Sequence, residues 1–337
     1  MPGSAVWGTR AGSEMEPTSG TALTGRDRLA EDVRRGLGRR QKQLQPRYLY
    51  DALGSQLFEA ICELPEYRIT RAERRLLAAH AAGIGGGLVS PVTLVELGGG
   101  NGEKLALLIE PLARTLPDLR VALVDVSATA LDLATRTLGR FPGLEVTGHQ
   151  TTYEDGLGRV VLGRSGDDTM LVAFLGSNIG NLDPSAARTF LGTLRSALRA
   201  GDRLVLGADL VKPEAELVLA YDDPLGVTAA FNKNLLGRLN RELGADFNLE
   251  RFAHRAVWNA TASRVEMHLE SLCAQTVSIP GADCVVRFVK GESVWTESSY
   301  KYVPEQVLAF GRAAGFGPAE QWIDRDAGFV VTRFVVT

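Results

Sequence analysis

Cysteine is scarce in this chain of 337 residues, and its three copies lie far apart: Cys62, Cys273 and Cys284. An odd number without any C-x-x-C pair speaks against a zinc site or a disulfide framework. Histidine is scarce too. Three of its four copies fit no metal-ligand spacing: His149, His254 and His268. We therefore expect no metal site and interpret these histidines as structural.

Long hydrophobic runs are also absent. No apolar stretch reaches the ~20 residues that a membrane-spanning helix needs, and the N-terminus lacks the apolar segment of a secretory signal. The net charge of -3 argues against broad binding to nucleic acids or membrane surfaces. We expect a cytoplasmic monomer that acts on a small molecule, with no nucleic-acid or membrane partner.

Several catalytic signatures are missing as well. The chain has no G-x-S-x-G, no H-E-x-x-H and no Walker lysine, so the motifs of serine hydrolases, zinc proteases and P-loop enzymes are absent. Its glycine-rich stretch, Gly98-x-Gly100-x-Gly102, is not the G-x-G-x-x-G fingerprint of dinucleotide-binding proteins. An NAD-dependent oxidoreductase is therefore a weaker hypothesis.

The chain is organised around residues 92–104. Residues 92–97 form a short β-branched run that is typical of a buried parallel strand. Glycines follow at 98, 99, 100 and 102, and a helix is predicted from about residue 103. Strand, glycine turn and helix make the nucleotide site of an open α/β sheet, because residues without a Cβ let the backbone approach a ligand closely.

Two carboxylates indicate which ligand this turn binds. Glu96 precedes the turn, where a negative charge repels a pyrophosphate and suits a positively charged ligand. Asp125 ends the next predicted strand, where an acidic residue commonly accepts hydrogen bonds from ribose hydroxyls. Together they favour S-adenosylmethionine over NAD. The alternative is an ordinary strand–turn–helix unit without a ligand.

Strands and helices alternate through the middle of the chain. Strands are predicted near 92–97, 119–126, 144–150, 169–175 and 202–209, and helices at 103–115, 128–139 and 184–199. This alternation predicts an α/β fold with a doubly wound parallel sheet. A helical stretch follows at 213–243, then antiparallel strands at 254–259, 264–277, 283–289 and 293–296, a helix at 304–314 and a strand at 329–336.

The change of pattern after residue 209 predicts two domains. The chain divides into a disordered tail, 1–23; a substrate-binding α+β domain, 24–71 with 212–301; and the parallel-sheet domain, 72–211 with 302–337. The tail is rich in Gly, Ser, Thr and Pro, a composition typical of disorder. Thr70 is predicted to cap a helix at 71–82, with Glu73 completing a capping box.

Six motifs occur in an order that matches a known family. They start at Tyr48, Leu64, Leu175, Tyr221, Arg264 and Thr296 and read YLYDALGSQLF, LPEYRITRAE, LGSNIGN, YDDPLGVTAAFN, RVEMHL and TESSYKY. From about Leu44 onward the chain resembles the histidine Nα-methyltransferases of ergothioneine biosynthesis. This resemblance implies a Rossmann-like class I methyltransferase domain beside a substrate domain. It also implies S-adenosyl-L-methionine as cofactor and trimethylation of L-histidine to hercynine.

The resemblance also implies site residues. By motif, cofactor contacts fall on Gly98, Lys104 and Asp125, and histidine contacts fall on Tyr67, Asn181, Tyr221, Glu297 and Ser299, with Tyr50 near the amine and Met267 beside the imidazole. Methyl transfer from a sulfonium needs an acceptor nitrogen held in line with the methyl carbon more than it needs acid–base chemistry. The catalytic candidates, Tyr50 and Asn181, are therefore positioning groups.

The residue types suit these roles. Asn181 follows a predicted strand end, and its amide can donate to a carboxylate while its oxygen accepts from an amine. Tyr221 can donate a second bond to the carboxylate. Glu297 can accept an imidazole N–H and Ser299 can serve the other ring nitrogen. Glu297 and Ser299 follow the strand predicted at 293–296 and are two residues apart, so we expect them to face the same side.

Each assignment has an ordinary structural alternative. Asn181 can cap the helix that begins near Pro184, and Lys104 can be a surface lysine in a first helical turn. Glu297 can be a solvated strand-end carboxylate, and the tyrosines can be core aromatics with wet hydroxyls. Met267 is expected to be simple lining rather than a specific contact.

One stretch departs from the bacterial pattern. Bacterial relatives usually carry Asp-Phe after the third strand, where this chain has Thr152 and Tyr153. Both are candidate cofactor residues, with Tyr153 stacking on or flanking the adenine. The change resembles the fungal branch of the superfamily, which includes tryptophan N-methyltransferases. Another amino acid, such as tryptophan, is therefore the competing substrate, although an indole cannot use both Glu297 and Ser299. A non-catalytic adenosylmethionine-binding protein is the remaining alternative.

Overall fold

The computed structural model describes residues 25–337, so the predicted tail at 1–23 lies outside the described part. Its helices are α1 (Gly25–Leu37), η1 (Pro46–Leu49), α2 (Ala52–Glu63), α3 (Ile69–Gly85), α4 (Glu103–Leu112), α5 (Ala128–Leu138), α6 (Tyr153–Leu162), η2 (Asn178–Asn181), α7 (Pro184–Ala197), α8 (Glu214–Leu219), α9 (Val227–Leu243), η3 (Leu249–Arg251), η4 (Pro280–Ala282) and α10 (Pro304–Ala313). Its strands are β1 (Lys42–Gln43), β2 (Val92–Leu97), β3 (Leu119–Asp125), β4 (Glu145–Gln150), β5 (Thr169–Phe174), β6 (Arg203–Asp209), β7 (Phe252–Asn259), β8 (Arg264–Ser271), β9 (Gln275–Ile279), β10 (Cys284–Phe288), β11 (Ser293–Tyr300), β12 (Ala319–Asp324) and β13 (Phe329–Val335).

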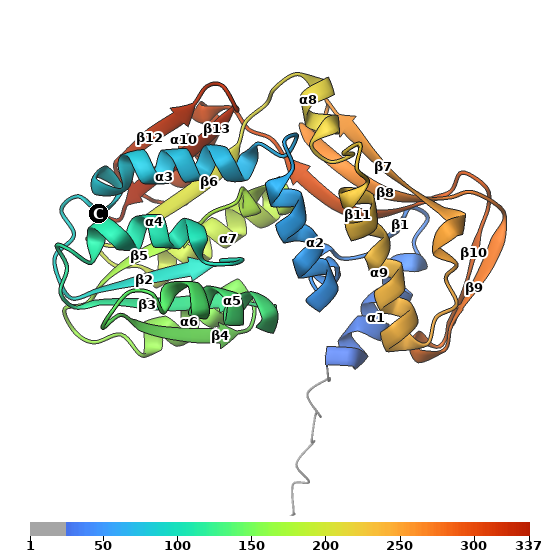
Figure 1. Cartoon of the computed structure of the whole chain (residues 1–337), viewed down its shortest axis with the longest axis horizontal. Helices are drawn as coiled ribbons and strands as arrows, with labels where there is room; N and C mark the ends of the chain where they lie inside the picture. The colour runs from blue at the N-terminus through green and yellow to red at the C-terminus, as the bar shows by residue number, and fades with distance from the viewer. Residues whose placement is uncertain (1–24) are drawn as a thin grey trace, which may run out of the picture.

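A seven-stranded sheet dominates one half of the molecule, in the order β12-β13-β6-β5-β2-β3-β4 (Figure 1). Strands β2 to β6 pair in parallel, and β13 runs antiparallel to β6. The order reverses between β2 and β5, which makes their carboxyl ends the switch point where open α/β sheets bind ligands. The predicted doubly wound, Rossmann-like α/β fold is confirmed.

Helices cover both faces of this sheet. Helices α3, α4 and α5 pack on one face and α6, α7 and α10 on the other. The strand side chains alternate accordingly, because successive residues of a strand point to opposite faces. Leu94 belongs to the core under α3 and α4, whereas Val95 belongs to the core under α6 and α7. Both cores are closed, since each of these side chains is fully buried.

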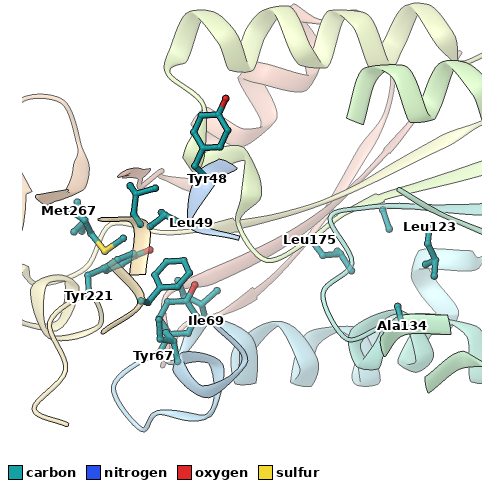
Figure 2. Packing of buried hydrophobic residues seen from close by; sticks show 14 of the residues in the cluster. Tyr48, Leu49, Tyr67, Ile69, Leu123, Ala134, Leu175, Tyr221 and Met267 are labelled. Carbon is teal, nitrogen blue, oxygen red and sulfur yellow. The ribbon is translucent and has the colours of Figure 1, made fainter. Parts of the chain in front are cut away.

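The other half is built on a four-stranded sheet in the order β1-β11-β8-β7, next to the β9–β10 hairpin (Figure 1). Helix α9 packs on β7 and β8 and against α2, which lies between the two halves. The hydrophobic core under α3 continues from Leu175, Leu123 and Ala134 into this half, where Tyr67, Tyr221 and Met267 belong to the same cluster (Figure 2). The two sheets therefore share one apolar interior.

The chain crossings after β6 and after β11 run side by side. Leu210, just after β6, forms a parallel bridge with Tyr302, just after β11. The backbone N–H of Tyr302 donates to Asp209 O (3.1 Å), and the N–H of Val211 donates to Tyr302 O (2.9 Å). The carboxyl ends of β6 and β11 are thereby held in fixed relation.

The structure changes several details of the sequence prediction. The predicted strand at 264–277 is two strands, β8 and β9, separated by a turn. The short strand β1, the strand β12 and the helix α6 were not predicted. Helix α3 begins at Ile69 without a side-chain cap, so the capping box of Thr70 and Glu73 is wrong. Glu73 is fully buried, because α3 lies against the sheet rather than in solvent.

We keep the division into two domains as a proposal. The four-stranded sheet and the seven-stranded sheet support it, since each has its own strands and its own covering helices. The predicted boundary at 71/72 falls inside α3, a helix that packs on β6, β12 and β13. We therefore propose a boundary in the turn before α3.

Two glycines of α6 provide a test of this packing. Gly156→Ala is expected to destabilise the fold by about 1–3 kcal/mol through overpacking, because an added Cβ would lie 2.2 Å from Cγ1 of Val124. Gly158→Ala is the matched control in the same helix, with nothing within 4 Å of the new Cβ, and is expected to stabilise by roughly 0.5–1 kcal/mol. Urea unfolding measures both. A Gly156→Ala midpoint at or above that of the wild type contradicts the packing of α6 on β3.

Candidate active site

Two connected cavities lie at the carboxyl edge of the parallel sheet. The larger has a volume of about 1120 Å3 and follows the glycine turn after β2. The smaller has a volume of about 460 Å3 and reaches toward β8 and β11. Both are lined by Tyr50, Phe58, Tyr67, Gly176, Asn178 and Asn181. These shared walls connect the glycine turn to the four-stranded sheet.

The glycine turn forms the floor of the larger cavity. Gly98 has a φ of 76°, a backbone conformation that residues with a Cβ rarely adopt. A Cβ at this position would also lie 2.7 Å from both the Tyr153 hydroxyl and Nδ2 of Asn178. Glycine is therefore required for conformation and for space, and the space it leaves belongs to the cavity.

The two carboxylates that were predicted to face the ligand, Asp125 and Glu96, lie in different surroundings. Asp125 ends β3 and lines the larger cavity, and its Oδ1 accepts from the Ser127 N–H at 2.8 Å. Burial raises the pKa of Asp125, and hydrogen bonds from the backbone N–H groups of Ser127 and Val126 oppose the rise. Glu96 does not line the cavity. It lies fully buried beneath the turn, and its two carboxyl oxygens have no partner among residues 25–337. Burial raises its pKa to about 8, so the prediction that Glu96 faces the ligand is wrong.

Lys104 lines the cavity from the first turn of α4. Its Nζ lies 2.9 Å from Oε2 of Glu73, and Glu73 also accepts from the Gly176 N–H at 2.9 and 2.8 Å. The attraction of Glu73 for the ammonium outweighs burial and raises the pKa of Lys104. The alternative of an ordinary surface lysine is wrong. This buried ion pair ties α3, α4 and the end of β5 together.

Thr152 and Tyr153 have different surroundings in the structure. Tyr153 lines the larger cavity, and its ring contacts Phe174 and Phe190 edge-on or tilted. Thr152 is not among the lining residues. It is the N-cap of α6, with Oγ1 accepting from the Asp155 N–H at 3.4 Å, so its cofactor role has no geometric support.

All seven predicted amino-acid-site residues line the smaller cavity: Tyr50, Tyr67, Asn181, Tyr221, Met267, Glu297 and Ser299. They come from segments up to 249 residues apart in the numbering, from position 50 to position 299. Figure 2 shows Tyr67, Tyr221 and Met267 in the same part of the core as Leu49. The rings of Tyr67 and Tyr221 meet edge to face with centroids 6.1 Å apart. Burial raises the pKa of Tyr50, Tyr67 and Tyr221, so all three hydroxyls stay protonated near neutral pH.

Asn181 ends η2 directly after β5. It does not cap α7, because Asp183 does so and accepts from the Ser185 and Ala186 N–H groups at 2.8 Å. Within residues 25–337 the Asn181 side-chain amide has no hydrogen-bond partner. Its donor and acceptor are therefore both available to a ligand.

A β-bulge aims Glu297 into the cavity. Trp295 pairs with His268, and Glu297 pairs with Met267, so Thr296 is an extra residue in β11. Without the bulge, Glu297 would share the outer face with Trp295, since alternate residues share a face. With the bulge, Glu297 and Ser299 both point inward and are buried. The prediction that they share one face stays valid, but the bulge decides which face.

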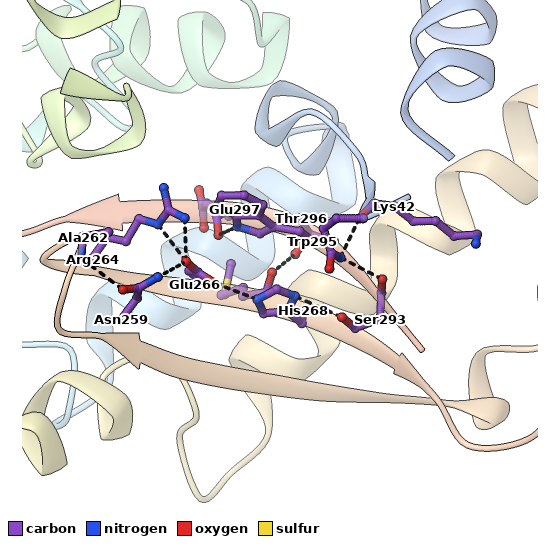
Figure 3. Close-up of polar contacts among 12 residues, drawn as sticks. Lys42, Asn259, Ala262, Arg264, Glu266, His268, Ser293, Trp295, Thr296 and Glu297 are labelled. Atoms are coloured by element: carbon purple, nitrogen blue, oxygen red, sulfur yellow. Dashed lines mark hydrogen bonds and ion pairs between the residues drawn. The ribbon is translucent and has the colours of Figure 1, made fainter. Parts of the chain in front are cut away.

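Polar contacts among residues of β8 and β11 stabilise this bulge (Figure 3). The Thr296 hydroxyl donates to Met267 O (3.0 Å), and the Trp295 indole N–H donates to Glu297 O (2.8 Å). The Arg264 guanidinium lies 4.3 Å from the centroid of the Trp295 ring and 2.7 Å from Glu266. These contacts hold the strand while the Glu297 carboxyl faces the cavity.

Sequence reasoning missed Lys301 and Asp209. Lys301 is 1% exposed and Asp209 is 2% exposed, and their charged atoms are 2.8 Å apart. Lys301 Nζ donates to the Tyr221 hydroxyl (2.8 Å) and to Ser299 Oγ (2.9 Å). The signal was present, because residue 301 continues the two-residue alternation of positions 297 and 299.

A parallel sheet with this strand order, a glycine turn and an acidic residue at the end of the second parallel strand fits the class of S-adenosylmethionine-dependent methyltransferases. The profile of the family described as "Histidine-specific methyltransferase, SAM-dependent" matches residues 29–335. The chain belongs to this family, which confirms the predicted family, enzyme class and cofactor.

Individual relatives agree. The histidine N-alpha-methyltransferase of Mycolicibacterium smegmatis is 43% identical over 303 residues, covering 89% of this chain and 92% of the relative. That of Mycobacterium tuberculosis is 41% identical over 302 residues, with 89% and 92% covered. The ergothioneine biosynthesis protein 1 of Neurospora crassa is 29% identical over 290 residues, which are 83% of this chain and 32% of that protein.

Glu297 yields a prediction about stability and pH. Burial raises its pKa from 4.5 to about 7, partly offset by the charge of Lys301. The unfolded carboxyl ionises near its ordinary pKa of 4.5, whereas the folded one stays protonated to about pH 7. Ionisation therefore costs stability as the pH rises through this range, and the full cost is present above pH 7. Glu297→Gln removes this cost and is expected to stabilise the fold by roughly 1–3 kcal/mol at pH 8 and by much less at pH 5.

Denaturant unfolding at both pH values measures this difference. Glu305→Gln is the control, because Glu305 is exposed and its carboxylate stays in water in either state. Equal effects of Glu297→Gln at pH 5 and pH 8 would show that the carboxyl is not held in its neutral form.

Proposed function

We propose that the protein transfers methyl groups from S-adenosylmethionine to the α-amino group of L-histidine and forms the trimethylated product, hercynine. The observation that carries this proposal is the wall that two cavities share. The cavity lined by Glu297 and Ser299 has six lining residues in common with the cavity over the glycine turn. The function of the bacterial relatives supports the same conclusion.

The cofactor fits the larger cavity. Gly98 and its neighbours leave a cradle that a Cβ would fill, and Asp125 presents a carboxylate at the point where ribose hydroxyls bind in such sheets. When bound, S-adenosylmethionine supplies an electrophilic methyl group. We propose that Asp125 holds the ribose, that Tyr153 lies against the adenine, and that Lys104 lies beside the cofactor while its charge is balanced by Glu73.

The amino acid fits the smaller cavity. We propose that Asn181, whose amide is unpaired in the described part of the chain, donates to the substrate carboxylate and accepts from the amine. Tyr50 and Tyr67 border both cavities and therefore position the amine at their junction. Holding the acceptor nitrogen in line with the methyl group is the main catalytic task. Met267, 2% exposed and opposite Glu297 across β8 and β11, provides apolar lining.

The far wall favours histidine over tryptophan. The Glu297 carboxylate accepts an imidazole N–H and Ser299 serves the second ring nitrogen. An indole has one N–H and would leave a buried polar group without a partner, which costs about 1–3 kcal/mol. An NAD-dependent oxidoreductase is excluded by membership of the methyltransferase family.

The cofactor proposal predicts a loss of affinity in Asp125→Ala. Removal of the carboxylate takes away charge-assisted bonds to the ribose hydroxyls and is expected to weaken S-adenosylhomocysteine binding by about 2–3 kcal/mol. Calorimetry measures the affinity. Asp132→Ala is the control, because Asp132 is exposed on α5 and does not line the cavity. An unchanged affinity in Asp125→Ala refutes the ribose contact.

The substrate proposal predicts the outcome of an amino-acid panel. Incubation with S-adenosylmethionine is expected to add three methyl groups to histidine and few or none to tryptophan. Histamine, which lacks the carboxylate, is expected to react at least ~100-fold more slowly, because a positioned anchor is lost. Mass spectrometry of the products measures all three. Equal rates for histamine and histidine would refute the carboxylate anchor, and a preference for tryptophan would refute the proposed substrate.

A further inference from the structure

Lys301 lies directly behind the substrate cavity and not in its lining. It follows Glu297 and Ser299 on the same face of β11 and its continuation, and all three side chains are buried. Its Nζ contacts Asp209 Oδ2 at 2.8 Å, Tyr221 Oη at 2.8 Å and Ser299 Oγ at 2.9 Å. A buried lysine thus contacts two residues of the cavity wall from the rear.

The hydrogen bonds of this ammonium are complete. A lysine ammonium has three N–H donors and no acceptor. One donor serves Asp209, one serves Tyr221 and one serves Ser299. The carboxylate of Asp209 favours the charged form and raises the pKa of Lys301 against the effect of burial. The ammonium therefore stays charged and in one orientation.

The hydroxyls of Tyr221 and Ser299, which both contact Lys301, have one proton each for hydrogen bonding. The Tyr221 hydroxyl donates to Ser299 Oγ at 2.8 Å. Each hydroxyl oxygen also accepts from Lys301, so both lone pairs of Ser299 are occupied. One hydroxyl proton, that of Ser299, remains without a partner in this triangle. Ser299 therefore presents a hydrogen-bond donor to the cavity and not an acceptor.

Lys301 lies between the carboxylate of Asp209 on one side and the carboxyl of Glu297 on the cavity side. Asp209 binds Lys301 through Oδ2 and Lys212 through Oδ1 at 2.7 Å. Two ammonium groups thus share one carboxylate. On the cavity side, the titratable lining residues are Tyr50, Tyr67, Tyr221 and Glu297. Glu297 is the acidic group among them, and the Lys301 charge lowers its pKa.

We propose that Lys301 is a positioning residue that selects the neutral imidazole ring. Lys301 and Tyr221 together fill both lone pairs of Ser299, so Ser299 can only donate and requires a ring nitrogen with a free lone pair. By its charge Lys301 favours the carboxylate form of Glu297, which accepts the N–H of the other ring nitrogen. The inference rests on the proposed function, because it specifies which form of histidine the same cavity takes.

This arrangement limits what Tyr221 can do. Its only proton is engaged with Ser299, so a bond from Tyr221 to the substrate carboxylate requires the Tyr221–Ser299 bond to reverse. In the reversed state Ser299 becomes an acceptor and no longer matches a ring nitrogen that carries no proton. The carboxylate anchor therefore falls mainly on Asn181, and Tyr221 acts through Ser299.

The test compares two lysines of the same carboxylate. Lys301→Met removes the ammonium behind Tyr221 and Ser299. Lys212→Met removes the other cation of Asp209, which bonds Ala327 O and does not contact the cavity residues. The wild type and both variants are assayed for kcat and KM with histidine from pH 6 to pH 9. Calorimetry with S-adenosylhomocysteine reports the cofactor site, where Lys301 makes no contact.

Lys301→Met is expected to raise the KM for histidine about 10-fold to 100-fold with a smaller effect on kcat. The reason is that Ser299 is no longer held as a donor to the imidazole ring. The acid limb of kcat/KM is expected to move to higher pH, since Glu297 loses a favourable charge. Cofactor affinity stays within about twofold. Lys212→Met is expected to keep the wild-type KM and acid limb. Wild-type values in Lys301→Met, or equal shifts in both variants, overturn the proposal.

A second variant guards against misfolding. Lys301→Met leaves Asp209 with one cation, and an incompletely paired buried carboxylate destabilises a fold. The double variant Lys301→Met with Asp209→Asn removes both charges of the pair and is expected to show the same rise in KM. A wild-type KM in the double variant overturns the role of the ammonium.

The wild-type arm separates this inference from the proposed function. Absence of histidine turnover in the wild type refutes the proposed function and, with it, the selection of imidazole. Histidine turnover together with an unchanged KM in Lys301→Met refutes only the role of Lys301.

Discussion

The carboxylate of Asp209 links the two halves of the molecule. It ends β6 of the parallel sheet, and it binds the ammonium of Lys301 at the end of β11 in the other sheet. The bridge between Leu210 and Tyr302 fixes the backbones at the same place. The wall that carries Glu297 and Ser299 is thereby set against the carboxyl edge of the parallel strands. Together with the shared apolar core, this link sets the distance between the glycine turn and the wall of the smaller cavity.

Buried charge is the second theme of the site. Glu73 is balanced by Lys104 and by the Gly176 N–H, whereas Glu96 and Glu297 have raised pKa values because burial disfavours their charged forms. An apolar core would be more stable at these positions, since desolvation of a carboxylate is costly. For Glu297 the cost has a purpose, because a carboxyl facing the cavity can discriminate among ligands. Glu96 lies under the turn, and its carboxyl oxygens have no hydrogen-bond partner in the described part of the chain.

Local sequence patterns predicted the parts of the site that depend on local structure. The strand, glycine turn and helix around residue 98 need only neighbouring residues, and so does the acidic end of β3 at Asp125. The wrong predictions concern residues whose surroundings come from elsewhere. Thr70 and Glu73 match a capping box in the sequence, but α3 packs on a sheet that buries Glu73. Thr152 lies next to Tyr153 in the chain, yet the start of α6 turns the two side chains to different surroundings.

The sequence by itself determined the fold class, which follows from strand and helix periodicity. It also determined the family, and the family motifs indicated seven of the residues that line the smaller cavity. Only the tertiary structure decided how those residues are used. The bulge at Thr296 turns Glu297 inward because β8 fixes the register of β11. Lys301 joins Tyr221 and Ser299 because two chain crossings meet at Asp209. Such contacts connect residues far apart in the chain, and no local pattern of side chains encodes the direction in which each one donates its proton.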